Sequence, residues 1–228
     1  MIRYGFLVVL LAVSLNAIGS ETDINLKNLC KNQIREGLNT LHSDIKVLVK
    51  QYDYLTFIQW GDLNKDNIDD LAFFVESEKG KTKLLVYIYN KKEKKYILRG
   101  VNDTLPPSYE HLPSVKEFED YQLLSSITID KLLILKFSKI NYHTIFSGVD
   151  NQYKFQYRDH KMKLIGAELL EYSRAKGDGF AESINYLSGK KESYEVVDVH
   201  KKLGKSKWSK LKKAKLMELE EFLYEDVN

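Results

Sequence analysis

Side chains that carry oxygen atoms recur at every second position of one short segment. In "GDLNKDNIDDLAFF", counting from Asp62, the residues Asp62, Asn64, Asp66 and Asp70 occupy positions 1, 3, 5 and 9, and Ile68 occupies position 7. A tightly coiled loop can turn alternate side chains inward while position 7 contributes its backbone carbonyl oxygen. The segment therefore predicts a site for a hard divalent cation, with these five residues as its ligands.

Calcium is the cation that this donor set favours. Four side chains and one carbonyl leave room for water, and Ca²⁺ accepts an irregular, partly hydrated shell of oxygens. Mg²⁺ requires a stricter octahedron, and Zn²⁺ prefers nitrogen and sulfur ligands, which this segment lacks. Magnesium and manganese are the competing ions. The alternative is a hairpin turn whose Asp and Asn side chains cap their own backbone without any ion.

The residues after the loop exclude an EF-hand. An EF-hand loop ends in a bidentate Glu at position 12 and continues into a helix, whereas position 12 here is Phe73 within the strand-like segment "LAFFVES". Position 6, where such loops commonly place a glycine with positive φ, is Asn67. Asparagine tolerates that conformation better than most other residues.

On these residues, "GDLNKDNIDDLAFF" resembles the calcium loop of FG-GAP and VCBS-type repeats, in which a D-x-[DN]-x-D-G-x-x-D segment leads into a β-strand. The resemblance implies a calcium ion that holds a hairpin and takes no part in chemistry. The loop occurs as a single copy, so a whole propeller is not expected. The order of the leader, this loop, "YKFQYRDHKMKLIGAE" and "SINYLSGKK" is also similar to a group of small exported bacterial proteins whose function is not established.

The first residues have the pattern of a secretory signal peptide. Arg3 precedes an apolar run that ends near Leu15, and small residues follow up to Gly19. The run has about ten residues, half of the roughly 20 that a membrane-spanning helix needs. We therefore expect a signal peptide over residues 1–19, a secreted or periplasmic product, and no transmembrane segment after cleavage. The single cysteine, Cys30, excludes an intramolecular disulfide.

Residues 20–228 are predicted to form a single, mainly β (α+β) domain. Apolar residues spaced by three to five positions over residues 23–52 predict an N-terminal helical segment. Beyond it, short aromatic and β-branched segments predict strands of an antiparallel β-meander or sandwich-like sheet. Polar hairpin turns are expected at residues 78–81, 91–95, 130–131 and 158–161. The segment "RAKGDGFAES" is expected to be a loop, and the lysine-rich C-terminal tail is left open between helix and strand.

No catalytic motif accompanies the loop. The chain lacks a G-x-S-x-G segment, a Cys–His signature and a phosphate-binding glycine loop, and its five histidines lack metal-ligand spacing. Its charge is close to balanced, with 35 Lys and Arg against 32 Asp and Glu, so we expect no nucleic-acid partner. The expected function is non-enzymatic: a secreted calcium-binding protein that binds or scaffolds an extracytoplasmic protein or polysaccharide. The alternatives are an exported hydrolase with an unlocated active site and an envelope-associated protein that uses the basic tail.

Overall fold

The computed structural model of the chain describes residue 52 and residues 54–77, 79–108, 123–140, 147–173, 175–198, 202–212 and 214–224. The expected signal peptide lies outside these residues, as does the expected N-terminal helical segment except for Tyr52. Both remain predictions. Among the described residues, no helix is long and apolar enough to cross a membrane.

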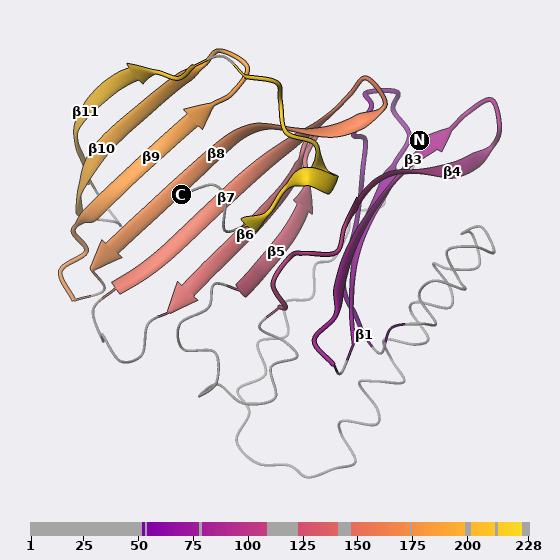
Figure 1. The fold of residues 1–228 in the computed structure, drawn as a ribbon, viewed down its shortest axis with the longest axis horizontal. Coiled ribbons are helices and arrows are strands. Elements are labelled where there is room, and N and C mark those ends of the chain that lie inside the picture. The colour runs from indigo at the N-terminus through magenta and orange to yellow at the C-terminus, as the bar shows by residue number, and fades with distance from the viewer. Residues whose placement is uncertain are drawn as a thin grey trace, which may run out of the picture. The chain divides into compact units, whose positions relative to one another are not determined.

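The described chain forms two antiparallel sheets, each of which follows the order of the sequence (Figure 1). The four-stranded sheet contains β1 (Tyr54–Gly61), β2 (Asp70–Glu76), β3 (Thr82–Asn90) and β4 (Lys95–Asn102). The seven-stranded sheet contains β5 (Leu123–Ile129), β6 (Leu133–Ile140), β7 (Ser147–Arg158), β8 (Lys161–Ser173), β9 (Gly179–Asn185), β10 (Lys190–Asp198) and β11 (Lys202–Lys210). The prediction of a mainly β, antiparallel meander is confirmed.

Short hairpins produce this order. At the β7–β8 turn, Asp159 and His160 both have positive φ, 49° and 63°, between the paired residues Arg158 and Lys161. A two-residue loop with two positive φ angles matches the right-handed twist of its strands. The expected turns between β2 and β3, β3 and β4, and β5 and β6 also lie where the sequence places them.

The C-terminal third is where the sequence prediction is least accurate. The second half of "RAKGDGFAES" is not a loop, because β9 begins at Gly179. The tail contains a strand, β11, and then a single 3-10 turn, η3 (Leu219–Glu221). Alternating apolar residues are sparse in β9 to β11. The sequence of these strands therefore gives a weak strand signal, and their formation depends more on pairing with neighbouring strands.

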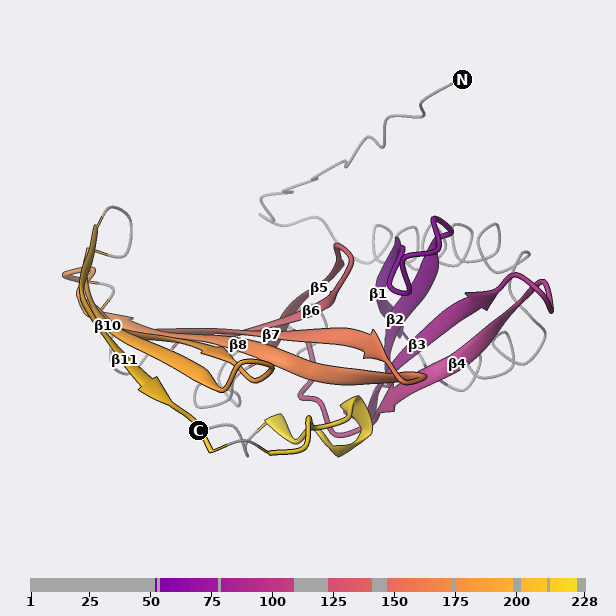
Figure 2. The ribbon, with the colours of Figure 1, turned by 90° about the horizontal axis from the view of Figure 1, so that it is seen from above.

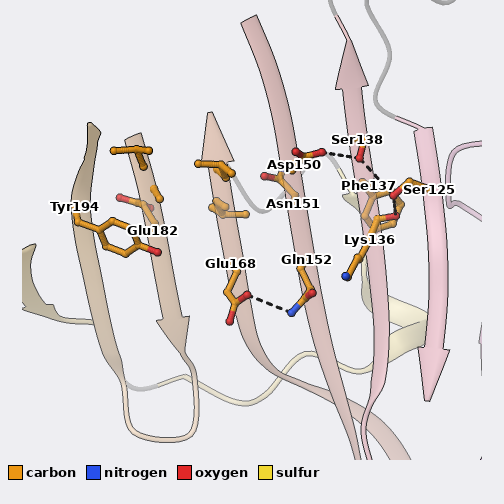
Figure 3. Close-up of a pocket in the computed structure, with 14 residues that line it drawn as sticks. Ser125, Lys136, Phe137, Ser138, Asp150, Asn151, Gln152, Glu168, Glu182 and Tyr194 are labelled. Atoms are coloured by element: carbon orange, nitrogen blue, oxygen red, sulfur yellow. Dashed lines mark hydrogen bonds between the residues drawn. The ribbon is translucent and has the colours of Figure 1, made fainter. Parts of the chain in front are cut away.

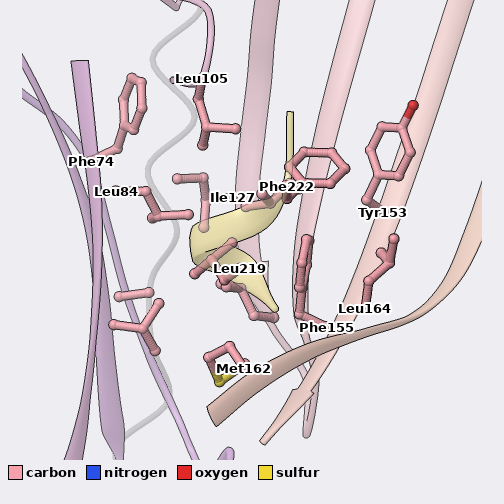
Figure 4. Close-up of a cluster of buried hydrophobic side chains, with 14 of the residues drawn as sticks. Phe74, Leu84, Leu105, Ile127, Tyr153, Phe155, Met162, Leu164, Leu219 and Phe222 are labelled. Carbon is pink, nitrogen blue, oxygen red and sulfur yellow. The ribbon is translucent and has the colours of Figure 1, made fainter. Parts of the chain in front are cut away.

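Both sheets contribute to one hydrophobic core, and η3 packs within it (Figure 4). Leu219 and Phe222 have no solvent exposure, and the Phe222 ring lies edge-on to the Tyr153 ring, with centroids 4.9 Å apart. The side-chain amide of Asn102, on β4, donates to the carbonyl oxygens of Leu219 and Phe222, both at 2.7 Å. The end of the predicted tail is therefore part of the core.

A buried carboxylate also connects the two sheets. Glu76, at the end of β2, is 2% exposed and accepts hydrogen bonds from Ser108 N at 2.8 Å, Ser108 Oγ at 2.7 Å and the Thr56 hydroxyl. Ser108 forms a β-bridge with Leu124 of β5. Because its donors come both from Thr56 on β1 and from Ser108, which is bridged to β5, Glu76 links the two sheets at this point.

Candidate metal centre

The aspartate-rich segment is the connection between β1 and β2. Gly61 and Asp70 are the last paired residues of these strands, so residues 62–69 form a loop closed by a strand pair. The strand after the loop is buried along its whole length. A loop whose end is anchored in this way has little freedom to move as a body.

Three of the predicted ligands turn their side chains back onto the loop backbone. Asp62 accepts hydrogen bonds from Asp66 N at 3.0 Å and Asn67 N at 2.8 Å, through different oxygens. Asn64 Oδ1 also accepts from Asp66 N, at 3.0 Å. Asp66 Oδ1 accepts from Ile68 N at 2.9 Å, and its other oxygen accepts from the Asn64 amide at 3.2 Å. The side chains at positions 1, 3 and 5 are therefore interconnected.

Asp70, at position 9, is a buried carboxylate that connects the loop to β3. It has no solvent exposure, and its Oδ2 accepts from the backbone N–H groups of Leu63 and Asn64, at 2.8 and 3.2 Å. Its Oδ1 accepts from Tyr89 N on β3, at 2.9 Å. Burial raises the pKa of Asp70 to about 6 and outweighs the opposing effect of these three N–H donors.

Two residues of the loop hold an uncommon backbone conformation. Asn67 has φ of 63°, as expected for position 6, and Lys65, at position 4, has φ of 64°. Positive φ is uncommon outside glycine, particularly for a residue such as lysine that lacks a short polar side chain. These two residues coil the chain tightly enough for residues 62, 64 and 66 to interact. Ile68 follows them in the loop, and ligation through its carbonyl oxygen stays a prediction.

The β3–β4 hairpin supplies contacts that the sequence does not predict. Lys91 Nζ donates to the Asp66 carbonyl oxygen at 2.5 Å and lies 3.9 Å from Asp66 Oδ2. The Tyr96 hydroxyl donates to the Asp69 carbonyl oxygen at 3.2 Å, and burial, together with the charges of Asp70 and Asp69, raises its pKa. Lys91 lies in a turn with several other lysines, so no signal in the sequence separates it from its neighbours.

The chemistry of the donors fits a hard cation. All the side-chain donors are carboxylate or amide oxygens, which Ca²⁺ prefers, and they lie within nine residues of chain. In the described ranges, however, no three His, Cys, Asp or Glu side chains converge as a metal cluster. The carboxylates of this loop accept hydrogen bonds from backbone N–H groups. The predicted ligand set also includes the side-chain amide of Asn64 and the carbonyl oxygen of Ile68. Calcium therefore remains a prediction.

Comparisons with protein-family models, with curated proteins and with solved structures found no match for this chain.

Proposed function

We propose that this chain is a secreted calcium-binding protein whose β1–β2 loop holds one structural Ca²⁺, and whose role is binding or scaffolding rather than catalysis. One observation supports this most directly: the alternating oxygen donors at residues 62, 64 and 66 are drawn together by a loop with positive φ at Lys65 and Asn67. Aspartates this close repel one another unless a cation or hydrogen-bond donors compensate.

The proposed residues have distinct tasks. Asp62, Asn64 and Asp66 would hold the ion through side-chain oxygens, Ile68 would add its carbonyl oxygen, and Asp70 would add a buried carboxylate. A bound Ca²⁺ supplies positive charge that offsets the carboxylates. Because Asp70 also accepts from Tyr89 N, ordering of the loop would extend to β3. The ion would thus stabilise the four-stranded sheet from one end.

A thermal melt in calcium and in chelator tests this proposal. A ligand that binds only the native state stabilises it by RT ln(1 + [L]/Kd), which is about 2.7 kcal/mol at a hundredfold excess over Kd. The intact chain should melt at a higher temperature in calcium. Asp62→Ala and Asp66→Ala should lose that increase.

Asp69→Ala is the matched control. Asp69 is an exposed aspartate of the same loop and falls outside the alternating set. It should keep the calcium-dependent increase. A melting temperature of the intact chain that is the same in calcium and in chelator would rule out the structural calcium site.

The two alternative functions, an exported hydrolase and an envelope-associated protein, differ in how much the structure supports them. An exported hydrolase still lacks an assigned catalytic residue. Envelope association through a basic surface has one supporting observation, because the side chains of Lys205, Lys207 and Lys210 on β11 are all exposed. Charge reversal at these three lysines should abolish binding to anionic vesicles if that alternative holds.

A further inference from the structure

The seven-stranded sheet carries a continuous row of side chains on the face opposite its core. Cross-strand pairing aligns Ser138 with Asp150, Asp150 with Leu170, Leu170 with Ala181, and Ala181 with Tyr194. Residues directly opposite each other in antiparallel strands share a face. The row therefore crosses the five strands β6 to β10.

A second row runs beside the first. Lys136 pairs with Gln152, and Gln152 pairs with Glu168. Each lies two positions along its strand from a residue of the first row, which places both rows on one face. Phe137 and Leu169, each of which lies between a residue of one row and a residue of the other on its strand, point the other way, toward the core.

The two rows line a groove of about 390 Å³ that extends from Ser125 on β5 to Val196 on β10 (Figure 3). The sheet is curved rather than flat across these strands (Figure 2). Small-molecule sites typically measure about 300–1,000 Å³, so the groove has room for a small ligand or a short stretch of a polymer.

The polar side of the groove is suited to hydroxyl groups. Ser138 Oγ donates to Asp150 Oδ1 at 2.6 Å, and Gln152 Nε2 donates to Glu168 Oε2 at 3.2 Å (Figure 3). An ionised carboxylate has about four lone-pair positions, and an amide has both donors and an acceptor. Asp150, Gln152 and Glu168 can therefore bind further hydroxyls without breaking these bonds.

The opposite side of the groove is apolar. Ala181 and Val196 are only 4% and 3% exposed, and Leu170 and the ring of Tyr194 lie beside them in the lining. An aromatic ring with a hydroxyl group provides an apolar surface and a hydrogen-bonding end in one side chain. A ligand with both a C–H face and hydroxyl groups would match this division of the groove.

The charge of the groove favours a neutral ligand. Two of the lining carboxylates already have a lysine partner: Glu168 pairs with Lys154, and Glu182 pairs with Lys191 at 2.6 Å. The remaining charged lining residues, Asp150 and Lys136, have opposite signs. A nucleic acid or another polyanion would need a predominantly basic surface, and a polycation would need an acidic one.

We propose that this groove binds a neutral carbohydrate, with Tyr194 and Leu170 against a C–H face of a sugar and Asp150, Gln152 and Glu168 bonded to its hydroxyl groups. The groove lies on the seven-stranded sheet and uses none of the residues of the aspartate loop. The proposal is therefore independent of the calcium site.

A glycan array followed by calorimetry tests the groove with the full chain. The probes are neutral gluco-, xylo- and chito-oligosaccharides of about six units, with heparin, polygalacturonate and oligolysine as charged comparisons. We expect binding of at least one neutral oligosaccharide. Tyr194→Ala and Gln152→Ala should each weaken that binding about tenfold, as for the loss of roughly one good contact.

Phe180→Ala is the matched control. Phe180 is an exposed aromatic residue of β9, and it lies on the other face because it is adjacent to Ala181 in the strand. It should bind the probe like the intact chain, and circular dichroism should show all three variants folded. Failure to bind any neutral oligosaccharide, preferential binding of a charged probe, or equal binding by the Tyr194 and Gln152 variants would overturn the proposal.

Discussion

The aspartate loop and the groove use the same kinds of oxygen-bearing side chain in opposite ways. In the loop, Asp62 and Asp70 accept hydrogen bonds from backbone N–H groups, several of them only four to seven residues away. In the groove, Asp150 and Glu168 accept from side chains on neighbouring strands. Backbone donors hold a carboxylate in one position, whereas side chains can change rotamer. We propose an ion for the first arrangement and a ligand with many hydroxyls for the second.

The strands beneath the two sites differ correspondingly. Every residue of β2, which follows the loop, is buried. In β8, which crosses the groove, buried and partly exposed residues alternate over the first half. A strand buried on both faces gives the loop a fixed base, and an alternating strand leaves one face of the sheet open to solvent. Both depend on the core that the two sheets share.

The largest expected effect comes from disrupting that shared core. Phe222→Ala should destabilise the protein by about 3–5 kcal/mol, because it removes a fully buried aromatic ring. Denaturant unfolding measures the change. Leu223→Ala, one residue away and 44% exposed, is the control and should change stability by no more than about 0.5 kcal/mol. Equal effects of the two substitutions would contradict the role of the C-terminal segment in the core.

The next largest effect is the pH dependence of Asp70 in calcium-free protein. Because burial raises its pKa from 3.8 to about 6, protonation of Asp70 stabilises the native state. That stabilisation is fully present below pH 3.8 and is lost as the pH rises through 6, at a cost of up to about 3 kcal/mol. The stability of the intact chain relative to Asp70→Asn, measured in chelator, should therefore fall over this pH range.

Asp70→Asn is the appropriate reference because every other carboxylate titrates in both proteins. A relative stability that stays constant between pH 4 and pH 6.5 would show that the three N–H donors balance burial, and one that rises would show that they outweigh it.

The smallest effect concerns Lys91, which contacts the loop from the β3–β4 hairpin. Its ammonium group lies 3.9 Å from Asp66 Oδ2 and would compete with a bound cation. Lys91→Gln should strengthen calcium binding by up to about fivefold, the equivalent of one exposed ion pair. Lys92→Gln, an exposed neighbour in the same turn, should leave the affinity unchanged. Weaker calcium binding in Lys91→Gln would show that Lys91 supports the site instead.

The sequence predicts the loop more completely than the groove because of where the interacting residues lie. The spacing of Asp62, Asn64 and Asp66 is local, so the loop and its following strand can be read from consecutive residues. The predicted β-meander is likewise a property of neighbouring hairpins. Ser138 and Tyr194 share a face only after four strand pairings have formed, and no local pattern specifies that arrangement.

Two further features of the structure cannot be predicted from local sequence patterns: the burial of the C-terminal segment and the contact of Lys91 with the loop. Leu219 and Phe222 lie in a charged segment, and their carbonyl oxygens accept hydrogen bonds from Asn102, more than a hundred residues earlier. Lys91 reaches Asp66 only because β2, β3 and β4 are adjacent in the sheet. In both cases the order of the strands determines which residue becomes the hydrogen-bond partner, and the amino-acid composition of either segment does not predict that order.

Direct calcium titration by isothermal calorimetry is the most decisive measurement for the proposed function. We predict one Ca²⁺ bound per chain, no detectable binding when Asp62→Ala and Asp66→Ala are combined, and unchanged binding in Asp69→Ala. No binding by the intact chain at millimolar calcium, or equal binding by the double variant, would contradict the calcium site in the β1–β2 loop.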